Sequence, residues 1–136
     1  MARRRRLQTR AGLALVGLCA LTSPAIADAG QSYVSINAGG RILRVKPASI
    51  HLVSNENLNT LRWSSWGGSK ARGAGMDHSN FPSHGRSASN PVRVELRDRK
   101  RCGSKLVYTT IRIRFTRGIP YAGEPSLISF AYGCPT

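Results

Sequence analysis

Acidic side chains are scarce in this chain of 136 residues, which has 6 Asp and Glu residues against 21 Lys and Arg residues and a formal net charge of +15. Hydrolases of the paired-carboxylate class need two acids held about 5–10 Å apart. Nothing in the sequence argues for such a pair, and a pair assembled only by the fold stays open. The acids are Asp28, Glu56, Asp77, Glu95, Asp98 and Glu124.

Motifs for phosphate binding and nucleophilic catalysis are also absent. A P-loop ends in Gly-Lys-Ser/Thr, whereas Lys70 follows Ser69 and precedes Ala71. A dinucleotide fingerprint needs Gly-x-Gly-x-x-Gly at the start of a helix, but residues 73–75 continue as Met-Asp-His. There is no Gly-x-Ser-x-Gly elbow. The sequence therefore predicts no catalytic residue and no cofactor.

Cysteine is rare, with three residues in the chain. Cys19 lies inside an apolar N-terminal run and is interpreted as a small hydrophobic residue that is removed with this run. Cys102 and Cys134 allow a single pairing, so a disulfide is predicted in an oxidising compartment. Chain-entropy reasoning gives it roughly 3–4 kcal/mol of stabilisation. Two thiols without a nearby histidine make at most half of a zinc site, so no metal is predicted.

No apolar run is long enough to span a bilayer. Residues 11–21 are apolar and follow a segment with five arginines, but a transmembrane helix needs roughly 18 apolar residues or more. Ala25-Ile26-Ala27 fits a signal-peptidase site. We predict a signal peptide over 1–27 and a single secreted domain over 28–136, in the extracellular space or the cell envelope, with the export route open between Sec and Tat. Cleavage would remove five basic residues and no acids, which leaves a net charge of +10.

Helical periodicity and internal repeats are missing, and period-2 alternation takes their place. Residues 92–97 alternate Val and Leu with Arg and Glu, and residues 106–116 alternate in the same way over a longer stretch. Further strands are predicted over 41–45, 50–53, 58–63 and 127–132. Turns rich in Gly, Pro, Asn and Asp separate them. This pattern favours an all-β domain, either an antiparallel β-sandwich or a partly open barrel.

Residues 75–91 show no sustained period and are rich in Ser, Asn, Gly and Pro, so we predict a mobile surface loop there. Asp77, His78 and His84 belong to residue types that act as bases or metal ligands. Their spacing matches no known motif, and a flexible loop holds ligands poorly. A solvated loop is the favoured interpretation, and a small secreted hydrolase or metal-binding protein is the alternative.

The basic residues form the strongest chemical pattern. Arg93 and Arg97 share one side of their predicted strand, and Arg112 and Arg114 share one side of theirs. If these strands are neighbours, four guanidinium groups stand on one surface, with Glu95 among them. Such a face is either solvated or attracts an anion. With the residues of the adjoining turn, the predicted anion-binding set is Arg93, Arg97, Arg112, Arg114, Arg99, Lys100 and Arg101.

A stretch rich in Trp and Gly, residues 61–75, predicts a hairpin. Gly67-Gly68 is typical of a two-residue turn. Trp63 is expected to lie flat across a return strand that small residues leave bare. The predicted structural set is Trp63, Trp66, Gly67, Gly68, Ala71, Gly73 and Gly75.

The same stretch carries a family resemblance. Its pattern W-x-x-W-G-x-x-x-A-x-G-x-G, followed by Pro91–Leu96 and Cys102–Tyr108, resembles a family of small secreted actinobacterial proteins of uncharacterised function. The similarity covers most of residues 50–116. It implies a secreted all-β domain and no particular activity. The strong basicity and the segment with two histidines fall outside the family pattern.

We therefore expect a non-catalytic secreted protein that binds anionic envelope polymers, such as wall teichoic acids or acidic lipids, through its basic sheet face. A secreted inhibitor or protein-interaction module, with another protein as partner, is a further alternative. Nucleic acid stays open, although only Tyr108 interleaves with the cations and single-strand binding normally uses several aromatic side chains.

Overall fold

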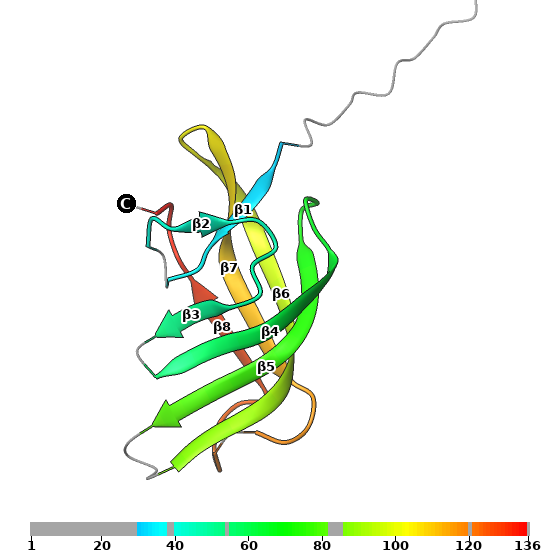
Figure 1. Ribbon diagram of the computed structural model, residues 1–136, viewed down its shortest axis with the longest axis vertical. Helices are drawn as coiled ribbons and strands as arrows, with labels where there is room; N and C mark the ends of the chain where they lie inside the picture. The colour runs from blue at the N-terminus through cyan, green and yellow to red at the C-terminus, as the bar shows by residue number, and fades with distance from the viewer. Residues whose placement is uncertain (1–29, 38–39, 54, 82–85, 120, 136) are drawn as a thin grey trace, which may run out of the picture.

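The computed structural model describes residues 30–37, 40–53, 55–81, 86–119 and 121–135, and the predicted signal peptide lies outside these residues. All regular structure in the described part is β-strand (Figure 1). The strands are β1 (Ser32–Ser35), β2 (Leu43–Arg44), β3 (Ile50–Val53), β4 (Glu56–Ser65), β5 (Ala71–Phe81), β6 (Arg86–Cys102), β7 (Lys105–Phe115) and β8 (Leu127–Ala131).

The strands form one sheet that curls into a half-barrel (Figure 1). Its order is β2-β1-β7-β6-β5-β4-β3, with β8 also paired to β7. Neighbours are antiparallel except β1 and β7, which run parallel. Past the end of β1, Asn37 forms an isolated bridge with His51 of β3, so the two sides of the curled sheet touch at this point. The predicted all-β fold, as a partly open barrel, is confirmed.

Period-2 alternation builds the core. Val92, Val94 and Leu96 of β6 pair with Phe115, Ile113 and Ile111 of β7. All six side chains are buried. Since successive side chains of a strand point to opposite faces, the residues between these positions lie on the other face of the sheet.

The prediction of a mobile loop over 75–91 is wrong for 75–81 and 86–91, which continue β5 and β6. The two strands stay in register from Ala71↔Leu96 to Phe81↔Arg86. The polar composition of this segment led to the wrong prediction, because Asp77 and Ser79 occupy inward positions where apolar residues are expected. Their backbone groups are satisfied by strands on both sides, which matters more than composition.

The tryptophan–glycine packing is as predicted, but the turn is not. Trp63 lies directly opposite Gly73, and a Cβ added to Gly73 would come within 2.9 Å of the Trp63 ring. Residues 66–70, rather than two glycines, connect β4 to β5. The longer connection carries Trp66 over to Tyr108, where the rings meet edge to face with centroids 5.5 Å apart.

The predicted disulfide is present. Cys102 at the end of β6 is bonded to Cys134 after β8, with the two Cα atoms 5.5 Å apart. The bond therefore ties the C-terminal segment to the tip of the β6–β7 hairpin.

Candidate anion-binding site

Five arginines from four neighbouring strands line one hollow on the face opposite the apolar core. We call it the arginine hollow and define it by Arg62 of β4, Arg72 of β5, Arg93 of β6, and Arg112 and Arg114 of β7. The strand registers place them together. Arg62 is opposite Ala74, Ala74 is opposite Arg93, and Arg93 is opposite Arg114, which makes one row across the sheet.

A second row lies beside the first. Arg72 is opposite Glu95, and Glu95 is opposite Arg112. Strand spacing separates neighbours in a row by about 4.8 Å, and two residues along a strand separate the rows by about 7 Å. The arginines therefore surround an area wider than a single side chain.

Small residues keep the space between the arginines open. Gly73, Ala74 and Val94 line the hollow between them, and Ser64 and Leu127 contribute further walls. Its volume is about 520 Å³. A longer side chain in place of Ala74 would fill the gap between Arg62 and Arg93. Gly73 thus accommodates Trp63 on the inner face, and its neighbour Ala74 leaves room for a ligand on the outer face.

Glu95 is the single acid among the residues that line the hollow in the described part of the chain. Its Oε2 accepts a hydrogen bond from Arg72 Nε at 3.1 Å, and its Oε1 lies 3.4 Å from Arg97 Nε. The Arg72 side chain is 62% exposed, so this pair contributes at most about 1 kcal/mol to stability. Its main effect is to orient Arg72 at the edge of the hollow.

The other four arginines of the hollow carry no ion pair within the described residues. Salt bridges there involve only Arg72 and Arg97, both with Glu95. Arg93 and Arg114 stand directly opposite each other, an arrangement in which like charges repel. The hollow therefore holds an excess of positive charge that the described part of the fold does not neutralise.

The structure divides the predicted anion-binding set. Arg93, Arg112 and Arg114 line the hollow, and Arg97 lies at its edge beside Glu95. Arg99 is half-buried and donates to Ser32 Oγ at 3.0 Å and to the Gly67 carbonyl, so it holds the β4–β5 connection. Lys100 and Arg101 are exposed near the tip of the β6–β7 hairpin, outside the residues that line the hollow.

Sequence reasoning missed Arg62 and Arg72. Arg62 lies within the strand predicted over 58–63, and Arg72 lies within the hairpin predicted over 61–75. Alternation gives the face of each residue, but only the order of β4 to β7 shows that these faces join. To find Arg62 and Arg72 from the sequence, one would have needed a signal that the hairpin of residues 61–75 pairs with the strand of residues 92–97.

Aromatic side chains do not line the hollow in the described part of the chain. Tyr108, predicted to lie on the arginine face, is buried. Its hydroxyl donates to the Gly68 carbonyl at 2.9 Å and accepts from the Gly67 N–H at 3.1 Å. Stacking of unpaired bases, as in single-strand binding, therefore has no platform among these residues.

The inner face holds a second unusual cluster, a buried pair of acids. Asp77 is fully buried and Glu56 is 5% exposed, and they come from neighbouring strands in which Glu56 is opposite Ser79. Ser79 Oγ donates to Asp77 Oδ2 at 2.6 Å. Burial, and then the charge of Asp77, raise the pKa of Glu56 to about 7. Burial also raises the pKa of Asp77. The fold thus assembles a carboxylate pair for which no sequence motif argues.

The predicted Asp77/His78/His84 cluster does not come together in the described residues. Asp77 points into the interior whereas His78 is exposed, because neighbours in a strand face opposite ways. His84 lies outside the described residues. Within the described ranges, no group of three or more His, Cys, Asp or Glu side chains is arranged to hold a metal ion.

No protein-family model, curated protein or solved structure matches the chain. The family resemblance of the Trp–Gly stretch therefore stays a prediction. Across the described ranges, no helix is long and apolar enough to cross a membrane.

Proposed function

We propose that this is a secreted, non-catalytic protein that binds anionic polymers of the cell envelope through the arginine hollow. The observation that carries the proposal is the convergence of five arginines from β4, β5, β6 and β7 on a hollow with one acid. Guanidinium groups present a planar fork of donors that matches phosphate and carboxylate oxygens. The excess positive charge supplies attraction over a longer range.

Retention on an immobilised anionic polymer tests the proposal. The protein is eluted from a teichoic-acid matrix with increasing NaCl, and its affinity is plotted against salt concentration on logarithmic axes. Each phosphate neutralised adds about 0.7–0.9 to the slope for nucleic acids. The Arg93→Gln, Arg112→Gln, Arg114→Gln triple variant is expected to lose about two to three units of slope and to elute early.

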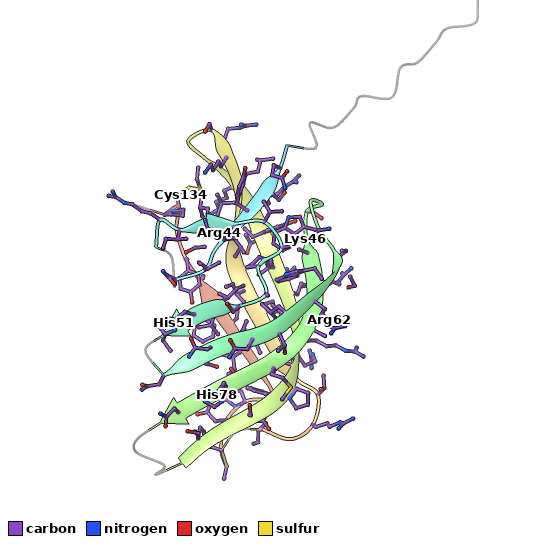
Figure 2. The ribbon with its side chains drawn as sticks, in the orientation of Figure 1. Arg44, Lys46, His51, Arg62, His78 and Cys134 are labelled. Carbon is purple, nitrogen blue, oxygen red and sulfur yellow. A yellow bond between two sulfur atoms is a disulfide. The ribbon has the colours of Figure 1, made fainter. Side chains whose placement is uncertain are left out.

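A charge-matched control separates the hollow from net charge. Arg41, Arg44 and Lys46 are exposed and do not line the hollow, and Figure 2 shows Arg44 beside β2, away from Arg62 of β4. The Arg41→Gln, Arg44→Gln, Lys46→Gln variant loses the same three charges and is expected to elute close to the parent. Equal losses in both triple variants would show that only total charge matters and would contradict the proposal.

The alternative of a protein partner predicts a different result. A protein interface that buries apolar area keeps its affinity when salt screens charges. Retention that survives about 1 M NaCl would therefore favour an interaction module over a polymer-binding protein.

A further inference from the structure

We infer that the arginine hollow is a site for two directly linked phosphate groups, as in a diphosphate or a polyphosphate chain. The inference rests on the proposed function and gives it a ligand class. It is carried by the charge of the hollow, the spread of its cations and its volume.

The charge of the hollow exceeds what one phosphate group neutralises. Five arginines and Glu95 give a formal charge of +4. A single phosphate monoester carries about −1.5 to −2 at neutral pH, so it leaves about half of this charge unbalanced. Two linked phosphates carry a charge of roughly −3 and leave about one positive charge of the hollow unbalanced. A carboxylate brings only one charge with two oxygens.

The arrangement of the cations points to an elongated anion. Arg93 and Arg114 are direct cross-strand neighbours, about 5 Å apart at the backbone. Arg112 and Arg72 belong to the second row, about 7 Å along the strands, on either side of Glu95. One phosphate can bridge Arg93 and Arg114, and a second linked to it can reach the row of Arg112. Each phosphate offers several oxygens, so two arginines can share one group.

The size of the hollow agrees with this. The hollow has a volume of about 520 Å³ and is partly open to solvent. One inorganic phosphate would leave most of this space to water, whereas a chain of linked phosphates uses both rows.

Glu95 lowers the net positive charge of the second row. Its two oxygens hold Arg72 and Arg97. Its negative charge repels any anion that approaches Arg112, and this repulsion grows with the charge of the anion, as the attraction to the arginines does. Glu95→Gln keeps an acceptor oxygen and removes the repulsion.

Calorimetric titration of the purified protein with pyrophosphate, phosphate and citrate at fixed ionic strength tests the inference. Citrate carries about the same charge as pyrophosphate but in carboxylates. Pyrophosphate is expected to bind one site at least about tenfold more tightly than either of the other two. The Arg93/Arg112/Arg114→Gln variant should lose about tenfold or more, and the Arg41/Arg44/Lys46→Gln control should stay within about twofold. Glu95→Gln should bind both anions more tightly, and pyrophosphate should gain more than phosphate because it carries more charge.

The outcomes distinguish the inference from the proposed function. Equal affinity for citrate and pyrophosphate, or for phosphate and pyrophosphate, overturns the inference while polymer retention can still stand. Retention that does not depend on the hollow arginines overturns both. ADP and long-chain polyphosphate both contain two directly linked phosphates, and the one that binds more tightly identifies the source of the ligand.

Thermal unfolding of each variant confirms that it is folded. The parent should gain thermal stability with pyrophosphate because the repulsion between Arg93 and Arg114 is relieved.

Discussion

Single residues decide the chemistry on both faces of this sheet. On the outer face, Glu95 pairs with Arg72 and Arg97, and its single negative charge leaves the hollow with an excess of positive charge. On the inner face, Glu56 and Asp77 are buried beside each other, with no cation within salt-bridge distance among the described residues. Burial favours the neutral form of a carboxyl group, and a second carboxylate adds to this. The inner pair therefore keeps a proton at a pH where exposed acids have lost theirs.

The pair makes stability depend on pH with a defined sign. The pKa of Glu56 is raised from its ordinary value of 4.5 to about 7, so the folded state binds more protons than the unfolded state between these values. Stability is fully present below about pH 4.5 and is lost as pH rises to about 7. We expect the free energy of unfolding to fall by roughly 3 kcal/mol across this window.

Urea unfolding of the parent and of Glu56→Gln at intervals from pH 4 to pH 8 measures this effect. The amide stays neutral, so the variant should lose the part of the pH dependence that Glu56 contributes and should be the more stable protein at pH 8. Asp77 keeps its own contribution, because burial also raises its pKa. If the free energies of unfolding of the two proteins change with pH in parallel, the raised pKa of Glu56 is contradicted.

The hairpin of β4 and β5 is the element that serves both faces. Gly73 and Gly75 lie under Trp63 and Leu61, and added Cβ atoms would approach these side chains to 2.9 Å. Trp63 Nε1 donates to the Pro47 carbonyl at 2.8 Å, so the indole also anchors the segment before β3. Between these glycines, Ala74 faces the arginine hollow. One run of small residues therefore provides room for an indole inside and for a ligand outside.

Truncating the indole tests this account of the hairpin. Trp63→Ala should lower the free energy of unfolding by about 3–5 kcal/mol, because it removes a large packed ring and a partly buried hydrogen bond. Denaturant unfolding measures the loss, with the exposed Ser64→Ala as a nearby control expected within about 0.5 kcal/mol. Loss of anion retention in Trp63→Ala without loss of stability would instead assign the indole to binding.

The molecule as a whole is held by contacts between segments that are distant in the chain. β1 pairs in parallel with β7, Asn37 bridges to His51, and Tyr132 after β8 donates from its backbone N–H to the Thr109 carbonyl at 2.7 Å. The Cys102–Cys134 bond fixes the end of the chain near the tip of the β6–β7 hairpin. Because the sheet is a half-barrel, such links limit how far its two sides can separate.

Reduction of the disulfide should destabilise the whole sheet. A cross-link of this loop length restricts the unfolded chain by roughly 3–4 kcal/mol. The Cys102→Ser, Cys134→Ser variant should unfold at a correspondingly lower urea concentration, and addition of reductant should shift the parent to the same midpoint. A variant as stable as the oxidised parent would show that the bond is not a structural constraint.

Local features of this protein follow from its sequence, since they depend on the strand period and on residue type. Alternation in 92–97 and 106–116 placed valine, leucine and isoleucine inside and arginine outside, and two cysteines allowed one disulfide. The fit of Trp63 over Gly73 also follows from parity. The same reasoning failed for 75–81 and 86–91, because polar residues can fill a strand when both neighbouring strands satisfy its backbone.

Tertiary structure alone decided which faces and strands meet. The addition of Arg62 and Arg72 to the arginines of β6 and β7 depends on the order β7-β6-β5-β4. Arg99 does not belong to the hollow, because the β4–β5 connection lies beside it and the Gly67 carbonyl accepts its hydrogen bond. The pairing of Glu56 with Asp77 is likewise a matter of register. Strand parity is local and is written in the sequence, whereas strand order and register are set by burying all the apolar faces at once, which is a property of the entire chain.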